Sequence, residues 1–179
     1  DTGFVAQARA TAREAVGRTL TPFKDPAFSR RQAEKIRSLV ATRTKELPPR
    51  DPSAAMDLGL ALVPEDRRKQ GLVIDATVSQ NITGAIRDAL SKLGLITTKA
   101  ENAAARVWAS RLEVKTRALD AVAGTLSGGN QQKVVLAKWL ATTPKVLIID
   151  EPTRGIDVGT KAEVHRMMSE LAGQGLGIL

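Results

Sequence analysis

The segment 126–152 constrains the fold of this chain more than any other part of its sequence. Residues 127–133 read Ser-Gly-Gly-Asn-Gln-Gln-Lys and open an amphipathic stretch, and the apolar run 146–149 ends in Asp150 and Glu151. The first stretch predicts a helix N-terminus, whose free N–H groups and dipole attract an anion. The second predicts a buried strand of a parallel sheet, with two carboxylates at its ligand-binding end. Together they indicate nucleotide hydrolysis.

Each half of this pattern also has a simpler interpretation. A Ser-Gly-Gly sequence alone is typical of an ordinary helix cap with a flexible lead-in, and Asp-Glu-Pro alone is adequate for a turn after a strand. The combination favours the chemical interpretation, because a buried strand that ends in two carboxylates needs a compensating charge. In that interpretation, Asp150 binds magnesium, usually through water, and Glu151 accepts a proton from an attacking water.

Length and composition limit the class of protein. A chain of 179 residues with 42% hydrophobic and 26% charged residues has the size and composition of one soluble globular domain with a real core. No apolar run approaches the roughly 20 residues that span a bilayer, and the amino terminus lacks the layout of a secretory signal. The absence of cysteine excludes disulfides and thiolate metal sites and fits a reducing cytoplasm.

The formal net charge of +8 raises the question of nucleic acid or an anionic membrane surface. The chain has no tyrosine, and its three phenylalanines all lie within the first 28 residues, so no stacking platform accompanies the basic residues. The densest basic cluster, residues 67–69, follows two acidic residues and is typical of a solvated charged face. We therefore expect no nucleic-acid partner, while attraction to acidic lipid stays open.

The chain alternates predicted helices and strands, which indicates the α/β class. Helices are expected over 5–16 and 29–41. Three prolines between residues 48 and 52 then mark a boundary, because they support neither a helix nor a sheet ladder. We therefore divide the chain into a helical N-terminal segment, 1–50, and a main domain, 51–179. In the main domain we expect strands over 58–63, 146–149 and 175–179 and helices over 78–90, 99–114, 127–141 and 158–171.

Four segments of the main domain resemble one family. Leu-Ser-Gly-Gly-Asn-Gln-Gln-Lys at 126–133 resembles the signature motif of ATP-binding-cassette ATPases, and Val-Leu-Ile-Ile-Asp-Glu-Pro at 146–152 resembles their Walker B strand. Thr-Arg-Gly-Ile-Asp at 153–157 is similar to the D-loop that follows. Val-Pro-Glu-Asp-Arg at 63–67, with Gln-Gly-Leu at 70–72, resembles the second ATPase half of tandem cassettes that energise bacterial importers of ribose, galactosides and xylose.

The resemblance extends from about residue 49 to residue 179 and implies a fold, cofactors and residue roles. The implied fold is a partial P-loop NTPase domain of the cassette type: an incomplete parallel sheet flanked by helices, with the helical signature subdomain. The implied cofactors are ATP and Mg²⁺. Asp150 would serve the metal and Glu151 the hydrolytic water, Asp157 would communicate across a dimer interface, and Glu65 stands where most cassettes have a glutamine that couples the site to the membrane subunit. The signature residues would contact the γ-phosphate of an ATP held by the opposite cassette: Ser127, Gly128, Gly129 and Gln131.

The sequence departs from the family at the phosphate loop. No Gly-x-x-x-x-Gly-Lys-[Ser/Thr] occurs in it, and the region before residue 63 contains only Gly3, Gly17 and Gly59. A phosphate cradle needs successive free N–H groups in glycine conformations together with a lysine. We therefore expect this chain to offer its signature helix in trans to an ATP held by a second cassette half with an intact loop.

Two other functions stay open at this stage, namely a non-catalytic interaction module or gene remnant and a nucleic-acid-associated cassette protein, the latter suggested by the +8 charge. The segments at 63–67 and 130–133 argue for transport instead. In the transport interpretation the further partners are membrane permease subunits and, indirectly, a periplasmic sugar-binding protein. The expected location is cytoplasmic, peripheral at the inner face of the plasma membrane.

The missing phosphate loop gives a first testable prediction. Titration of the isolated 179-residue chain with ATP should give negligible binding, because nothing in its sequence supplies the cradle that holds the β- and γ-phosphates. Isothermal titration calorimetry with an intact cassette as the positive control measures this. An affinity comparable to that of the intact cassette would contradict the argument from the loop.

Overall fold

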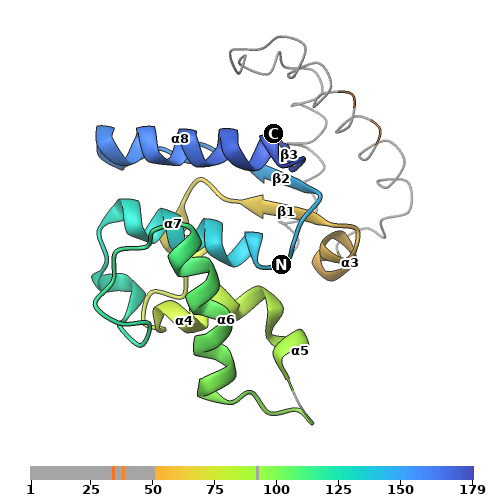
Figure 1. Cartoon of the computed structure of the whole chain (residues 1–179), viewed down its shortest axis with the longest axis vertical. Helices are drawn as coiled ribbons and strands as arrows, with labels where there is room; N and C mark the ends of the chain where they lie inside the picture. The colour runs from red at the N-terminus through yellow and green to blue at the C-terminus, as the bar shows by residue number, and fades with distance from the viewer. Residues whose placement is uncertain (1–33, 35–37, 39–50, 92) are drawn as a thin grey trace. The chain divides into compact units, whose positions relative to one another are not determined.

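The structure is a computed structural model that describes residues 34, 38, 51–91 and 93–179 (Figure 1). The helices expected over 5–16 and 29–41, and the assignment of 1–50 to a separate segment, concern residues that lie almost entirely outside this described part. The described residues fall into two compact units. Unit 1 contains 51–62, 144–149 and 166–179, and unit 2 contains 63–143 and 150–165, with residue 92 outside the description.

A three-stranded sheet has the order β1 (Leu60–Val63), β2 (Val146–Ile149) and β3 (Gly177–Ile178) (Figure 1). β2 and β3 are parallel, with Val146 opposite Gly177. The Val146 N–H donates to the Gly59 carbonyl oxygen and the Asp150 N–H to the Val63 carbonyl oxygen, each at 3.0 Å. The residue numbers of the two partners increase in the same direction, so β1 is parallel to β2. All three predicted strands are confirmed.

The apolar side chains of these strands form the core of unit 1. Ala55, Leu60, Leu62, Val146 and Ile148 are buried together. Ala55 comes from helix α3 (Pro52–Asp57), which the sequence analysis did not predict. We expected the prolines around it to exclude a helix, and that expectation was wrong at Pro52. Proline is tolerated at the first helical position, and the Asp51 side chain caps the helix by accepting from the Ala54 N–H at 3.1 Å.

Unit 2 is built on three packed helices, α4 (Val78–Thr83), α6 (Thr98–Arg111) and α7 (Gly128–Leu140), each of which contacts the other two (Figure 1). A further helix, α8 (Val158–Gly173), follows β2. The helices expected over 99–114, 127–141 and 158–171 are thereby confirmed within a few residues at each end. Among the described residues, no helix is both long and apolar enough to cross a membrane.

The expected single helix over 78–90 is interrupted in the structure. It consists of α4, a short 3₁₀ turn over Gly84–Ile86, and α5 (Arg87–Leu90). α4 is fixed at its start by a capping box, because the Gln80 N–H donates to Thr77 Oγ1 at 3.1 Å and the Thr77 N–H donates to Gln80 Oε1 at 3.0 Å. Apolar periodicity alone does not reveal where such a helix ends.

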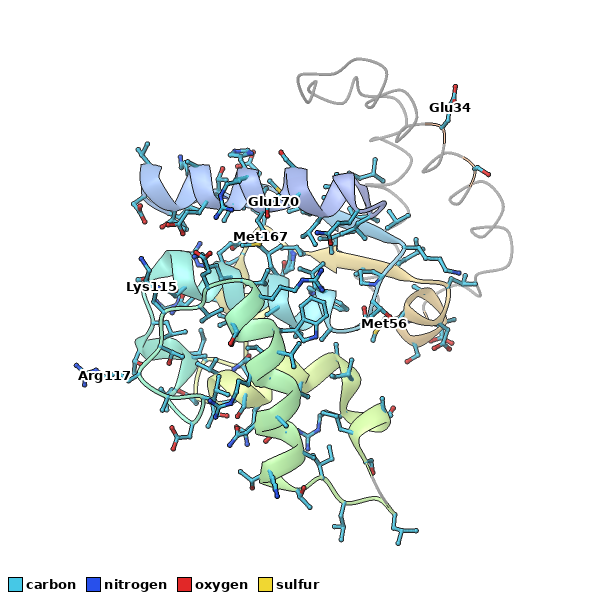
Figure 2. The ribbon with its side chains drawn as sticks, in the orientation of Figure 1. Glu34, Met56, Lys115, Arg117, Met167 and Glu170 are labelled. Carbon is cyan, nitrogen blue, oxygen red and sulfur yellow. The ribbon has the colours of Figure 1, made fainter. Side chains whose placement is uncertain are left out.

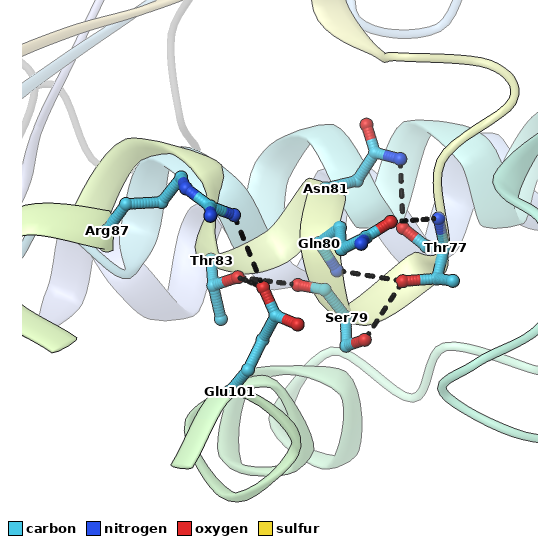
Figure 3. A network of polar contacts seen from close by, with 7 residues as sticks. All are labelled: Thr77, Ser79, Gln80, Asn81, Thr83, Arg87 and Glu101. Atoms are coloured by element: carbon cyan, nitrogen blue, oxygen red, sulfur yellow. Dashed lines mark hydrogen bonds and ion pairs between the residues drawn. The ribbon is translucent and has the colours of Figure 1, made fainter. Parts of the chain in front are cut away.

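Buried polar side chains hold α4 to its neighbours (Figure 3). Asn81 is only 4% exposed, and its amide binds the loop before the helix: Oδ1 accepts from the Val73 N–H at 2.8 Å, and Nδ2 donates to the carbonyl oxygens of Val73 and Thr77 at 2.9 and 3.0 Å. On the other side, Glu101 of α6 accepts from the Thr83 hydroxyl at 3.1 Å and from Arg87 at 3.4 Å.

The Asn81 network predicts a large effect on stability. Asn81→Ala should lower the free energy of unfolding by about 1–3 kcal/mol, because the Val73 N–H loses its acceptor and the carbonyl oxygens of Val73 and Thr77 each lose one of their donors. Chemical denaturation monitored by circular dichroism measures this change. Asn102→Ala is the matched control: the Asn102 Oδ1 atom is buried but finds no hydrogen-bond partner in the described part of the chain, so its removal should cost less than about 0.5 kcal/mol. Equal effects of the two substitutions would contradict this role for Asn81.

Candidate functional site

The site begins at the N-terminus of α7. Ser127 is the N-cap, and its exposed hydroxyl accepts from Asn130 Nδ2 at 2.9 Å and, more weakly, from the Asn130 N–H at 3.5 Å. Asn130 is itself held, because its Oδ1 accepts from the Lys115 N–H at 2.7 Å. The predicted helix N-terminus at Ser127 is therefore confirmed.

Two glycines in the first turn of α7 allow other segments of unit 2 to approach closely. A Cβ atom at Gly128 would lie 2.7 Å from Arg67 Nη2 and 3.1 Å from the Gly155 carbonyl oxygen. A Cβ atom at Gly129 would lie 2.5 Å from Thr160 Cγ2. Real Cβ atoms do not show contacts this short, so a larger residue would force the Arg67 guanidinium or the Thr160 side chain to shift. The chain's own packing thus requires both glycines, in addition to any approach of an anion.

Gln131 lies inside the helix packing. Its side chain is 2% exposed, and Nε2 donates to the carbonyl oxygens of Ala123 and Gly124, both at 3.4 Å. These carbonyls belong to a 3₁₀ turn, Ala123–Thr125, that leads into the signature segment. In this conformation Gln131 holds the turn that precedes the signature segment. The exposed part of the helix start consists of Ser127 and the backbone next to it.

Lys133 ties α7 to α8 within unit 2. Its side chain is 3% exposed, and Nζ lies 2.7 Å from Glu163 Oε2 and donates to the Glu113 carbonyl oxygen at 3.2 Å. A buried ammonium is tolerated only when it is paired and hydrogen-bonded in this way. Lys133 therefore fixes the helix that carries the signature and does not offer a charge to solvent.

The two predicted catalytic carboxylates follow β2 directly. The Asp150 N–H donates to the Val63 carbonyl oxygen at 3.0 Å, so Asp150 lies level with the end of β1, two residues before Glu65. Glu151 is exposed and has φ +44°, in the left-handed region that non-glycine residues rarely adopt. Such a residue costs roughly 1–3 kcal/mol, and residues of this kind cluster at functional sites, although Leu93, Glu113 and Thr143 also adopt a positive φ.

A magnesium ion would need more ligands than these carboxylates supply. In the described part of the chain, no group of three or more His, Cys, Asp or Glu side chains is arranged to hold a metal. Mg²⁺ is commonly bound by one or two carboxylates, with water and the phosphates of a substrate completing its shell. Asp150 fits that pattern and does not fit an ion bound by protein side chains alone.

Asp157 starts α8. Its Oδ1 accepts from the Thr160 N–H at 2.9 Å, and its Oδ2 accepts from the Thr160 hydroxyl at 2.7 Å. These hydrogen bonds, that of the hydroxyl first, lower the pKa of Asp157 from its ordinary value of 3.8. Thr160 also packs on Gly129, so Asp157 orients the residue that joins the first turns of α7 and α8.

Glu65 and Arg67 both contact the segment that follows Glu151. Glu65 forms an ion pair with Arg154, and Arg67 donates to the carbonyl oxygens of Arg154 and Gly155 at 2.9 and 3.3 Å. The interpretation of residues 67–69 as a solvated charged face was therefore wrong for Arg67. The interpretation holds for Arg68 and Lys69, which are both exposed. Lys69 Nζ lies 3.7 Å from Asp66 Oδ2. Arg67 is the site residue that the sequence analysis missed, since no sequence pattern links it to residues 87 and 88 positions away.

A separate cavity of about 520 Å³ lies between α6 and the loop that follows it. It is lined in part by Arg106, Glu113 and Arg117, and none of the predicted site residues lines it. Figure 2 shows Arg117 extending from the ribbon of this loop, on which the exposed Lys115 also lies. This cavity is therefore distinct from the site at the start of α7.

Comparison with known proteins identifies the family. Residues 27–154 match the ABC transporter family. The chain is 59% identical over 128 residues to the ribose import ATP-binding protein RbsA 1 of Streptomyces coelicolor, which is 72% of this chain and 25% of that protein. It is 52% identical over 140 residues to RbsA of Rhodococcus jostii, 78% of this chain and 28% of that protein. The chain thus spans about a quarter of the length of these curated relatives.

The fold of this chain is similar to those of solved ABC cassettes. A bacterial ABC transporter cassette solved as a dimer superposes with a TM-score of 0.58 at 21% identity, over 75% of this chain and 56% of that chain. A dimeric cassette in a post-hydrolysis state, bound to ADP and Pi, gives the same TM-score at 20% identity and the same coverage. The predicted fold class, a partial α/β cassette domain with an incomplete parallel sheet, is confirmed.

The lowered pKa of Asp157 predicts how stability depends on pH. Because this pKa is lower in the folded chain than in the unfolded chain, the ionised carboxylate stabilises the fold above about pH 4, and the stabilisation is lost as pH falls through the folded-state pKa. Urea midpoints of the wild type and of Asp157→Asn should therefore differ most near pH 7 and converge in acid. A difference that is the same at pH 7 and pH 3 would contradict this role.

Proposed function

Because the chain belongs to the ABC transporter family, we propose that it is part of the ATP-hydrolysing component of a bacterial monosaccharide importer of the ribose type. Two observations support the substrate class. The curated relatives described above are named for ribose import, and residues 63–67 carry the Val-Pro-Glu-Asp-Arg segment typical of such tandem cassettes. Since this chain covers about a quarter of those relatives, the complete activity belongs to a larger assembly.

One observation carries the proposal, namely the capped and exposed start of α7 at Ser127, backed by two glycines that admit no side chain. There the helix presents free N–H groups, the positive end of its dipole and a serine hydroxyl, a combination that suits a phosphate. We assign Ser127, Gly128 and Gly129 to the γ-phosphate of an ATP bound by an opposite cassette. Gln131 would then act by holding the turn behind them.

Asp150 and Glu151 would serve a second composite site. Asp150 would hold Mg²⁺ together with the phosphates, and the bound metal would supply compensating charge for them. Glu151, which is exposed in its left-handed turn, would accept the proton of the attacking water. Asp157 and the residues before it would face the opposite cassette, and Glu65 would take the place of the glutamine that couples the site to the permease.

The partners in this proposal are a cassette with an intact phosphate loop, the permease subunits and, indirectly, a sugar-binding protein. The location that follows is the cytoplasmic face of the plasma membrane, where a cassette can reach both the permease and ATP. No stacking platform for nucleic acid accompanies the basic residues, so we include no nucleic-acid partner.

The two composite sites make different predictions for substitutions in this chain. In an assembly with a loop-competent cassette, Ser127→Arg should reduce ATP hydrolysis by about 100-fold or more, because the arginine blocks the anion-binding helix start that serves the competent loop. Glu151→Gln should reduce it only a few-fold, since Glu151 serves the site for which this sequence supplies no loop. Steady-state phosphate release, at equal amounts of assembled complex, measures both.

Ala103→Arg provides the control, because it introduces the same side chain at an exposed position of α6, away from the site. It should leave the hydrolysis rate near that of the wild type. Equal and complete loss in Ser127→Arg and Glu151→Gln would refute this assignment of the two sites. Full activity in Ser127→Arg would instead support the alternative of a non-catalytic interaction module.

A further inference from the structure

Two residues of one segment hold two residues of another through a reciprocal set of contacts. The Glu65 carboxylate pairs with the Arg154 guanidinium, and the Arg67 guanidinium donates to the Arg154 and Gly155 carbonyl oxygens at 2.9 and 3.3 Å. Both the side chain and the backbone of Arg154 are therefore held from the same segment. All four residues lie in unit 2, so the contacts belong to one compact body.

Arg67 also reaches the start of α7. A Cβ atom placed on Gly128 would lie 2.7 Å from Arg67 Nη2 and 3.1 Å from the Gly155 carbonyl oxygen. The guanidinium group thus touches the signature and the D-loop segment at once. The planar guanidinium group of arginine has several donors in a fixed arrangement and can bind two carbonyl oxygens at once. The ammonium group of lysine is a single point charge and lacks this arrangement.

Arg67 is partly exposed, and its two bonds lie at the surface, but one atom of its side chain is enclosed. Its Nε atom is buried and finds no hydrogen-bond partner among the described residues, whereas the next residue, Arg68, is exposed. Leaving a donor unpaired costs free energy, so the surrounding contacts must hold the guanidinium where it is. The ion pair between Glu65 and Arg154 adds less, because these side chains are 38% and 65% exposed.

We infer that Arg67, assisted by Glu65, is a positioning residue that latches the segment 153–157 to the first turn of α7. The signature and the D-loop then move as one block, and any displacement of the segment 63–67 is passed to both. The catalytic consequence rests on the proposed function. The latch itself rests only on the contacts within unit 2.

Limited proteolysis tests the latch directly. Trypsin cleaves after Arg154 only when the Arg154 side chain and carbonyl are both released, and these are the two groups that the latch holds. Arg67→Ala should therefore speed cleavage at 154–155 by about tenfold, as followed by mass spectrometry of all fragments that begin at Gly155, since trypsin also cuts after Lys161 and Arg166. Arg67→Lys, which keeps the charge and loses the fork, should give a smaller increase. Arg68→Ala, the neighbouring exposed arginine, should leave the rate unchanged.

Kinetics separate positioning from general stability. In the assembled cassette pair, Arg67→Ala should lower kcat for ATP about tenfold and change KM less than about twofold, because the latch orders the D-loop and does not bind the nucleotide. Circular dichroism verifies folding, and Arg67→Lys takes its place if the alanine variant does not fold. Cleavage at 154–155 that is unchanged in both variants would overturn the latch. Hydrolysis that is absent in the wild-type assembly would instead overturn the proposed function.

Discussion

The absence of side chains at Gly128 and Gly129 is the constraint on which the site depends. Because these positions carry no Cβ atom, Arg67, Gly155 and Thr160 can all reach the first turn of α7. Two segments that are distant in the sequence, one at residue 67 and one at 155–160, thereby meet at the N-terminus of α7. A methyl group at either glycine would separate them by pushing against a guanidinium, a carbonyl group or a β-branched side chain, none of which can move without breaking other contacts.

Much of the fold could be predicted because it depends on local patterns. The strand 146–149 has the predicted bounds, and α7 starts after the predicted cap, since a continuous apolar run and a Ser-Gly-Gly start are short-range signals. Helix α3 and the break after Thr83 were not predicted. Proline at the first helical position and a capping box with a polar network act through individual hydrogen bonds, which hydrophobic periodicity does not register.

The parts of the site that depend on short-range sequence patterns could also be predicted. Sequence alone located Ser127, Asp150 and Asp157 at the starts or ends of elements, where the structure has them. It could not show that Gln131 is buried, because a glutamine in a helix has no sequence feature that reveals which side it faces. It also could not distinguish Arg67 from the basic residues next to it. Arg67 differs from them only through bonds to carbonyl groups 87 and 88 positions away.

These contacts also explain how a glutamate can stand at position 65. The pair between Glu65 and Arg154 is largely exposed, and exposed pairs contribute about 0–1 kcal/mol. The two bonds from Arg67 are also exposed, but they join one charged donor to two successive backbone carbonyl oxygens, so they hold the backbone of the segment as well as its position. The order of the D-loop segment therefore depends more on Arg67 than on residue 65. A change from glutamine to glutamate at 65 would then alter the charge of the segment while leaving its attachment to α7 intact.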